Sequence, residues 1–378
     1  MPVISVIMTS YNHGNFVAEA IESVLAQTFS DFEFIITDDG SPDNTPDIVS
    51  DYSKKDERIR PFFFKKNKGA CVALEECFKH SQGEYIAIIN SDDTWQAEKL
   101  EKQFNFLEKN CDIAAVFSRA QAVDERGAMI ESDFVSVFNA PENRSRHEWL
   151  RHFFFDGNCL CHPSVLIRRS GYVEAGGIYK KYLASLPDLD MWVRLCFKKS
   201  IHILDERLVN FRVLNDSRNE SADNIANRKR YAIEAPLVLD NYRKIASVDE
   251  FRLIFPDWSL FDNPSLIQYN LARCALTISS PWHKLFGMQL LYGLFIIDNG
   301  GEVVEGASFD VSDLHKIAKV YDVYNLEFSE KKYNLEFSEK KYNLEFSEKK
   351  YKRKYKKMKR FIFFLLTLLL VIFLYNFD

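Results

Sequence analysis

Three short polar clusters each follow an apolar run within the first hundred residues of the sequence. They read "TSYNHG" from Thr9, "TDDGSPDNT" from Thr37 and "NSDD" from Asn90. Adjacent carboxylates such as Asp92 and Asp93 repel each other, so a site that holds them usually supplies a cation or several hydrogen-bond donors. Each cluster taken alone is also consistent with an ordinary turn or a helix N-cap. Together, the three clusters indicate a ligand-binding site in which a cation or several hydrogen-bond donors offset the acidic pair.

The apolar runs around these clusters have the lengths and residue types of buried strands. They cover residues 3–8, 32–36, 59–64, 85–89 and 113–117. Apolar residues at helical spacing lie between them, as in the stripe over residues 16–25 and the stripe over residues 100–107. This alternation predicts an α/β fold with a mostly parallel sheet and helices on both faces. Ligands bind such sheets at the carboxyl ends of the strands, so we expect the three polar clusters to meet there.

The segments that carry these clusters resemble the nucleotide-binding half of a family 2 glycosyltransferase with the GT-A fold. They are "SVIMTSYNHGNFVAEAIESVLAQTFSDFEFIITDDGSPDNTPDIV" and "NKGACVALEECFKHSQGEYIAIINSDDTWQAEKLEKQ". The resemblance implies a Rossmann-like catalytic domain over residues 1–221, with the nucleotide-binding half in 1–118 and the acceptor half in 119–221. It also implies that Asp39 contacts the nucleotide base, usually uracil, and that Thr9 and Tyr11 line the uridine pocket.

The same resemblance assigns roles to the acidic pair. Asp92 would hold the ribose, and Asp93 with Asp92 would hold a Mn²⁺ or Mg²⁺ ion that bridges the diphosphate. Such an ion neutralises the negative charge that develops on the leaving group as the glycosidic bond breaks. Many relatives carry Asp where this chain has Asn90, so the metal would depend on Asp92 and Asp93. Asn90 can still hydrogen-bond the ribose.

The stretch "PDLDMW" resembles the acidic motif in the acceptor half of the same family. The match implies that Asp188 is the catalytic base and that Asp190 orients or caps the helix that carries Trp192. A helix N-cap is the alternative role for Asp188. Relatives often place a metal-assisting histidine where this chain has Leu214. His162 is a candidate substitute or acceptor-side residue, although a lone histidine is more often structural.

The remainder of the chain divides into three parts. Residues 222–320 have helical patterning without a chemical motif, which predicts a helical extension beside the acceptor side. Residues 321–357 contain "YNLEFSEKK" three times in succession and then a basic run. Each copy places Glu four residues before Lys, which favours a helical spacer; a disordered linker is the alternative. Residues 358–378 predict a transmembrane anchor, with an in-plane or re-entrant helix as the alternative at this length.

Charge and cysteine content support a cytosolic catalytic domain held at a membrane. Nine basic residues between 349 and 360 precede the apolar tail, which places the enzyme on the cytoplasmic face of the inner membrane. The net charge of -5 is mild, and we expect no nucleic-acid partner. Seven cysteines without a CxxC pair indicate reduced thiols; a metal site at Cys159 and Cys161 is a remote alternative.

The resemblance and the tail together predict a function. We expect an inverting, metal-dependent glycosyltransferase that moves a sugar from a nucleotide-diphosphate donor, most plausibly UDP-linked, to a hydroxyl of a glycan or lipid-linked acceptor in surface polysaccharide synthesis. Two alternatives stay open. The chain could be a nucleotide-sugar-binding protein with impaired chemistry, which would suit Asn90 and Leu214, or an assembly protein whose repeats and tail recruit a partner enzyme.

Overall fold

The computed structural model describes residues 1–214, 224–258, 261–297, 303–304 and 307–320 of the chain. Residues 1–318 form one compact unit. The predicted repeat spacer and membrane anchor fall within residues 321–378, outside the described residues, and they remain predictions. Within the described ranges, no helix is both long enough and apolar enough to cross a membrane.

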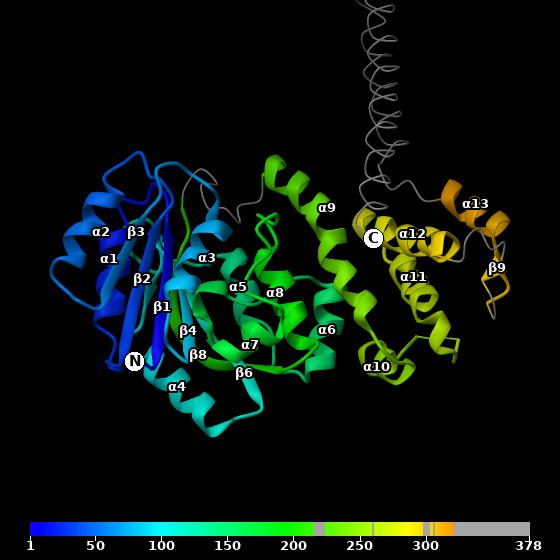
Figure 1. Ribbon diagram of the computed structural model, residues 1–378, viewed down its shortest axis with the longest axis horizontal. Coiled ribbons are helices and arrows are strands. Elements are labelled where there is room, and N and C mark those ends of the chain that lie inside the picture. The colour runs from blue at the N-terminus through cyan, green and yellow to red at the C-terminus, as the bar shows by residue number, and fades with distance from the viewer. Residues whose placement is uncertain (215–223, 259–260, 298–302, 305–306, 321–378) are drawn as a thin grey trace, which may run out of the picture. The chain divides into compact units, whose positions relative to one another are not determined.

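A mixed sheet forms the centre of the compact unit (Figure 1), and the described residues give it eight strands in the order β3-β2-β1-β4-β7-β6-β8-β5. Their bounds are β1 Ile4–Ser10, β2 Phe32–Asp38, β3 Ile59–Phe63, β4 Tyr85–Asn90, β5 Thr94–Trp95, β6 Ile113–Val123, β7 Leu166–Arg168 and β8 Ser200–Arg212. Only β7 and β5 run antiparallel to their neighbours. The mostly parallel α/β sheet predicted from the sequence is therefore confirmed, and each of the five predicted strands is present.

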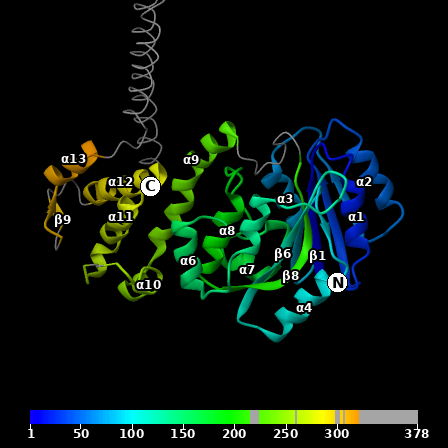
Figure 2. The same cartoon turned by 180° about the vertical axis from the view of Figure 1, so that it is seen from behind.

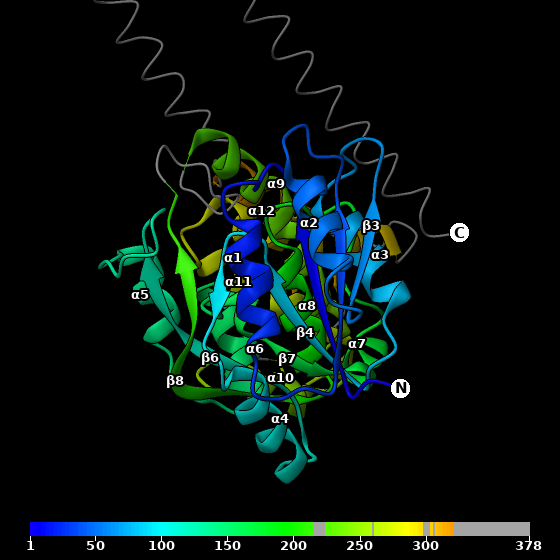
Figure 3. The ribbon, with the colours of Figure 1, turned by 90° about the vertical axis from the view of Figure 1, so that its left-hand side faces the viewer.

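Helices cover both faces of the sheet, and Figure 3 turns the α1 and α2 side toward the viewer. The helices up to β8 are α1 Val17–Leu25, α2 Thr45–Ser53, α3 Ala70–His80, α4 Lys99–Lys109, α5 Asp133–Asn139, α6 Arg146–Phe155, α7 Arg169–Glu174 and α8 Pro187–Cys196. Ile4, Val6 and Met8 alternate along β1 and share one core cluster with Val17 and Ile21 of α1. Every second residue of β1 thus anchors α1, whose preceding loop carries the first polar cluster.

A helical extension follows β8, as the patterning predicts. It contains α9 Ile225–Leu239, α10 Val248–Ile254, α11 Ile267–Thr277, α12 Pro281–Ile297 and α13 Val311–Val320, with a short hairpin of β9 Val303–Val304 and β10 Phe309–Asp310 that the sequence did not suggest. Figure 2 shows this part from behind. Tyr242, just after α9, donates a hydrogen bond to the Leu150 carbonyl of α6 at 2.6 Å, and its ring meets Phe154 edge-on. The extension therefore shares a core with the sheet domain.

Candidate active site

The three polar clusters meet at one edge of the sheet. Thr9 at the end of β1 lies opposite Thr37 of β2 on one side and Asn90 of β4 on the other. The clusters are also joined by side chains, because the His13 Nδ1 lies 2.8 Å from the hydroxyl of Ser91. This arrangement confirms that the clusters share the carboxyl ends of neighbouring strands.

Asp39 lies in a tight turn after β2 and faces the start of α3. Its two carboxylate oxygens accept the backbone N–H groups of Lys68 at 2.7 Å and Gly69 at 2.8 Å. Gly40 has a φ of +72°, and a Cβ there would come within 2.6 Å of the Lys66 backbone. The turn therefore requires glycine, and it fixes Asp39 against the N-terminal end of a helix, where negative charge is stabilised.

The other two residues expected to contact the nucleotide also lie at this edge. Thr9 is partly buried at the end of β1, and Tyr11, just beyond it, leaves 45% of its surface exposed. An exposed aromatic ring beside a strand end is available to stack on a planar ligand. The roles of Thr9, Tyr11 and Asp39 toward a nucleotide remain predictions.

The adjacent acids Asp92 and Asp93 have different environments. Asp93 is 1% exposed; its Oδ1 accepts the backbone N–H of Arg212 at 2.8 Å and its Oδ2 accepts the amide of Asn90 at 2.9 Å. Burial and the neighbouring Asp92 charge raise the pKa of Asp93 well above its ordinary value. Burial also raises the pKa of Asp92, against the opposing influence of His13 and Arg212. Asp93 is thus held from both sides by the protein.

The Asp92 side chain suits a cation better than the Asp93 side chain does. In the described part of the chain, no donor from another residue reaches the Asp92 carboxylate, whereas both oxygens of Asp93 are engaged. Among the described residues, no group of three or more His, Cys, Asp or Glu side chains is arranged to hold a metal. One protein carboxylate fits a Mg²⁺-type ion that takes its remaining ligands from water and substrate phosphates.

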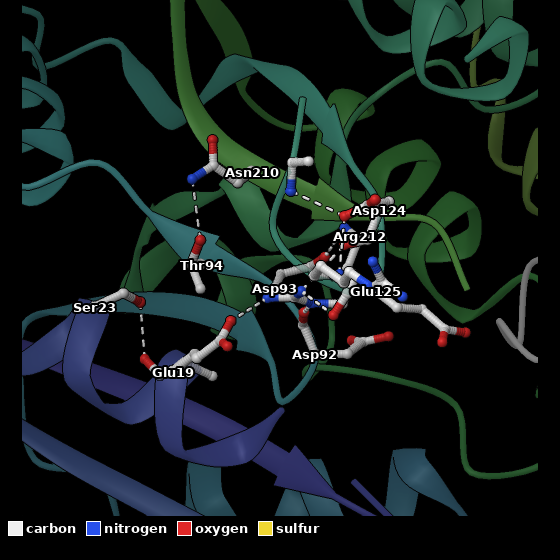
Figure 4. Close-up of polar contacts among 12 residues, drawn as sticks. Glu19, Ser23, Asp92, Asp93, Thr94, Asp124, Glu125, Asn210 and Arg212 are labelled. Atoms are coloured by element: carbon white, nitrogen blue, oxygen red, sulfur yellow. Dashed lines mark hydrogen bonds and ion pairs between the residues drawn. The ribbon is translucent and has the colours of Figure 1, made fainter. Parts of the chain in front are cut away.

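Arg212, at the end of β8, connects the acidic turn to the segment after β6 and to α1, as Figure 4 shows. Its guanidinium is buried and donates to the backbone oxygen of Asp92 at 2.7 Å, to those of Asp124 and Glu125 at 3.1 Å, and to the carboxylate of Glu19 at 2.5 Å. Sequence reasoning did not single out Arg212. The available signal was a basic residue within the apolar strand "RLVNFRV", because a buried arginine is almost always paired.

Asp188 lies in the first turn of α8, on the acceptor side of the predicted site. Its Oδ2 accepts the side-chain amide of Asn158 at 2.7 Å, and its Oδ1 accepts the backbone N–H of Leu189 at 2.7 Å. A small part of Asp188 is exposed, but most of the residue is enclosed by the protein, and this burial raises the pKa of Asp188 to about 6. A carboxylate with this pKa is mostly ionised at neutral pH and is more basic than an ordinary Asp, which suits a general base. Asn158 is a second residue that the sequence analysis missed.

Asp190, two residues later, has a supporting position. It is buried, and its oxygens accept the Arg194 guanidinium at 2.7 Å and the Asn241 amide at 2.8 Å. Arg194 in turn donates to the backbone oxygens of Ala175, Gly177 and Ile178. This buried network fixes α8 to the loop that follows α7, and it leaves Asp190 little freedom to contact a substrate.

Trp192 and His162 make packing contacts within the acceptor half. The Trp192 ring is fully buried and meets Phe117 of β6 edge-on, with ring centroids 4.9 Å apart, so it attaches α8 to the sheet. His162 Nε2 lies 2.6 Å from the Tyr179 hydroxyl, and burial lowers the pKa of His162 to about 4. At neutral pH the ring is therefore uncharged and held within the acceptor half. The geometry shows no contact from His162 to the acidic pair.

A hydrogen bond joins the acidic turn to this acceptor half. Trp95, two residues after Asp93, donates its indole N–H to the backbone oxygen of Pro163 at 2.9 Å. Pro163 directly follows His162 in the chain. Burial and the Asp93 charge also raise the pKa of the buried Cys161 thiol, which places Cys161 near that carboxylate. The two halves of the site are thus in contact through a short 3₁₀ turn at His162–Ser164.

All seven cysteines are free thiols, and six of them are buried. Cys159 and Cys161 lie in the core, where burial raises the pKa of both thiols. A thiol with a raised pKa is a poor metal ligand, because metals bind the thiolate. This environment argues against a metal site at these two cysteines.

Comparison with known proteins places the chain in a family. A family model described as "Glycosyl transferase family 2" matches residues 5–170. The Bacillus subtilis protein named "Putative teichuronic acid biosynthesis glycosyltransferase TuaG" is 33% identical over 218 residues, which cover 57% of this chain and 81% of that protein. An uncharacterized glycosyltransferase of Methanocaldococcus jannaschii is 31% identical over 61% of this chain and 77% of its own length.

Solved structures agree on the fold. The crystal structure of residues 1–349 of S. aureus TarS in complex with UDP-GlcNAc matches with a TM-score of 0.55 at 15% identity, over 86% of this chain and 92% of that one. A second TarS structure, in complex with UDP, gives a TM-score of 0.54 over 81% of this chain and 95% of that one. At this identity the likeness concerns the fold alone. The chain belongs to glycosyl transferase family 2, and its described part has a GT-A-like α/β fold.

Proposed function

We propose that the chain transfers a sugar from a UDP-sugar to a hydroxyl of a glycan or lipid-linked acceptor, with inversion at the anomeric carbon. The observation that supports this proposal is a carboxylate in each half of the catalytic domain. Asp92 lies at the carboxyl end of the parallel strands, and Asp188 lies in the acceptor half with a pKa raised to about 6. A transferase needs both a place for a charged leaving group and a base for the attacking hydroxyl.

The donor side would be formed by the three strand ends. Asp39 and Tyr11 flank the place where a uridine would lie, and Thr9 lies at the centre of that edge. The complexes of TarS with UDP and with UDP-GlcNAc support a uridine nucleotide, because that protein shares this fold. Arg212 would act at a distance from the donor, by fixing the backbone of the turn that carries Asp92.

The acceptor side would be formed around Asp188. The Asn158 amide donates to one oxygen of the Asp188 carboxylate and so fixes the orientation of that side chain. As the acceptor oxygen attacks the anomeric carbon, Asp188 takes the hydroxyl proton, and the bond between that carbon and the diphosphate oxygen breaks with its electron pair on the diphosphate. Attack from the face opposite the leaving group inverts the configuration.

The residues present fit a divalent cation at the donor side. We propose that Asp92 is the protein ligand for Mn²⁺ or Mg²⁺ and that Asp93 keeps the turn in shape, because the Asp93 oxygens already accept two hydrogen bonds. When bound, the ion would offset the negative charge of the diphosphate. Asp92 and Asn90 would orient the donor beside it.

The cellular role is also a proposal. The name of the Bacillus subtilis relative refers to teichuronic acid biosynthesis, which supports a role in surface polysaccharide synthesis. We also propose that the basic and apolar tail, residues 349–378, holds the enzyme at the cytoplasmic face of the cell membrane. A membrane position would bring the site close to a lipid-linked acceptor.

Activity of the purified full-length chain tests the proposed function. The chain is incubated in detergent with UDP-, GDP- and dTDP-sugars, with Mn²⁺, Mg²⁺ or chelator, and with soluble acceptor analogues. We expect release of UDP and transfer to an acceptor, both lost in Asp188→Asn. Binding of a nucleotide sugar without turnover on any donor would instead support a binding protein that has lost its chemistry.

A further inference from the structure

Glu234, in the middle of α9, reaches out of the helical extension and binds the start of α8. Its carboxylate accepts three backbone N–H groups, from Ala184 at 2.9 Å, Ser185 at 2.8 Å and Leu186 at 2.9 Å. The residue is only 5% exposed. Three main-chain donors therefore share one buried carboxylate, which lies 48 residues after Leu186 in the sequence.

These three N–H groups belong to the segment that leads directly into the helix of Asp188. Helix α8 begins at Pro187, and its N-cap residue, Leu186, has no side-chain oxygen with which to cap the helix. The first N–H groups of a helix have no partner within it, and a negative charge near them is favourable. Glu234 accepts the N–H of the N-cap residue Leu186, as the N3 glutamate of a capping box does, together with the N–H groups of the two residues before it, and it places a negative charge close to the start of α8.

The extension contacts the "PDLDMW" segment in a second place. Asn241, in the turn after α9, donates its amide to Asp190 at 2.8 Å. The extension thus holds the acidic motif on both sides of Asp188. Tyr231 lies one turn before Glu234. The Tyr231 hydroxyl lies beside Gly157, 3.4 Å from the position that a Cβ at Gly157 would take. Gly157 precedes Asn158, the residue that orients Asp188.

We propose that Glu234 is a positioning residue for Asp188, so that the helical extension forms a working part of the acceptor site. The inference rests on the proposed function, in which Asp188 is the base. Glu234 acts through the backbone of residues 184–186, and these bonds fix the first turn of α8 and with it the direction of the Asp188 carboxylate. A displacement of a catalytic group by about 1 Å can cost roughly 100-fold in rate, so this anchoring has catalytic consequences.

The chemistry of the contact requires a carboxylate. Three N–H donors need acceptors, and Glu offers two oxygens with several lone pairs. Gln has the same shape, but it replaces one oxygen by an NH₂ group that would face N–H donors. Glu234→Gln therefore leaves at least one buried donor unpaired while it changes the volume of the side chain little.

The test compares Glu234→Gln with Asp240→Asn as a matched control. Asp240 lies just beyond α9 and is about half exposed, and its described ion pair is with Arg243 rather than with α8. Both substitutions remove one negative charge from the same segment. We expect kcat for sugar transfer to fall by about 10–100-fold in Glu234→Gln, with unchanged UDP-sugar affinity, and to stay within about twofold of wild type in Asp240→Asn.

Two further readouts separate positioning from a purely structural role. The acidic limb of the kcat-pH profile should move to lower pH in Glu234→Gln, because a less enclosed Asp188 regains water and loses the burial that raises its pKa. In an Asp188→Asn background, Glu234→Gln should lower the residual rate by less than about twofold, because its effect passes through Asp188. Multiplicative rate losses in the double variant, or a lower melting temperature with wild-type kcat and pH profile, would overturn the inference.

The same series distinguishes failure of the proposed function from failure of this inference. If Asp188→Asn transfers sugar at the wild-type rate, the base is misassigned and both ideas fall. If Asp188→Asn is inactive while Glu234→Gln matches wild type, only the role of Glu234 falls. Should Glu234→Gln not fold, Glu234→Asp keeps the charge and shortens the reach. We then expect kcat to fall several-fold and to be partly rescued relative to Glu234→Ala, and wild-type kcat in Glu234→Asp would contradict the proposal.

Discussion

Asp93 accepts the backbone N–H of Arg212 at 2.8 Å, across a separation of 119 residues. The bond ties the turn after β4 to the end of β8, so the acidic pair is held by the last strand of the sheet domain. Because the Asn90 amide donates to the other oxygen, both oxygens of Asp93 are engaged in hydrogen bonds that stabilise the turn. Asp92 is the carboxylate of the pair that we propose as the cation ligand.

This difference predicts different outcomes for two substitutions. Asp93→Ala leaves the Arg212 N–H and the Asn90 amide without their acceptor, so it should lower the free energy of unfolding by about 1–3 kcal/mol. Asp92→Asn should leave stability within about 1 kcal/mol of wild type and abolish metal-dependent UDP-sugar binding. Urea unfolding and calorimetric titration with and without Mn²⁺ measure both. Undiminished metal-dependent binding in Asp92→Asn would remove Asp92 as the ligand.

Arg212→Lys should destabilise the fold although it keeps the charge. Lysine cannot reproduce the donors that Arg212 directs at Asp92, Asp124 and Glu125, so buried carbonyl groups lose their partners. We expect a loss of roughly 2–4 kcal/mol in unfolding free energy together with weaker donor binding. Glu19→Gln is the control, because the Glu19 side chain is 54% exposed and its ion pair should contribute less than about 1 kcal/mol. Equal losses in the two variants would contradict this account of Arg212.

The raised pKa of Asp188 predicts how stability depends on pH. The folded-state value of about 6 exceeds the ordinary 3.8, so between these pH values the folded protein binds more protons than the unfolded chain. Stability from this group is therefore present below pH 3.8 and is lost as pH rises through about 6. Asp188→Asn removes the cost of ionisation, about 3 kcal/mol at pH 7.5, but its NH₂ group faces the Asn158 amide or the Leu189 N–H, which offsets about 1–3 kcal/mol of that gain.

Thermal unfolding of wild type and Asp188→Asn across pH checks this prediction. The melting temperature of Asp188→Asn relative to that of wild type should rise as the pH increases from 4 to above 6. A variant that is less stable than wild type at pH 7.5 would mean that Asp188 has a structural role that the carboxylate alone supports.

The tail gives a prediction outside the described residues. Truncation after Ser347 removes the whole basic run and the whole apolar segment. We expect the shortened chain to leave the membrane fraction and still to transfer sugar to a soluble acceptor analogue, because none of the proposed site residues is lost. Fractionation of cell lysates followed by an activity assay measures both. Retention of the truncated chain in salt-washed membranes would place the membrane contact elsewhere.

The sequence predicted the elements better than the contacts between them. Strands such as β1 and β4 carry mainly apolar runs, and the polar clusters at their ends follow from parallel pairing, so both were predictable. The three-residue strand β7 was not predictable, because "LIR" is too short to show an alternating pattern. It joins the sheet by pairing with β4 on one side and β6 on the other.

The same limit applies to the site. Asp188 and Asp190 were found through their resemblance to a motif, but their different environments depend on partners far along the chain. Asn158 and Arg194 distinguish the two carboxylates, and Glu234 holds the segment before them. No local pattern shows that a glutamate in one helix will accept backbone N–H groups just before a different helix, 48 residues earlier. Buried charges within otherwise apolar segments, such as Arg212 and Glu234, are the signal to look for.

The most direct test of the central claim is the transfer rate and the UDP-sugar affinity of Asp188→Asn, measured on the same preparation. Asn keeps the shape of Asp but cannot take the proton of the acceptor hydroxyl. We expect transfer to fall by roughly 10²–10⁴-fold while donor affinity stays within about twofold of wild type, because Asp39 and Asp92 are untouched. An unchanged transfer rate, or a loss of donor affinity that parallels the loss of rate, would contradict the assignment of Asp188 as the base.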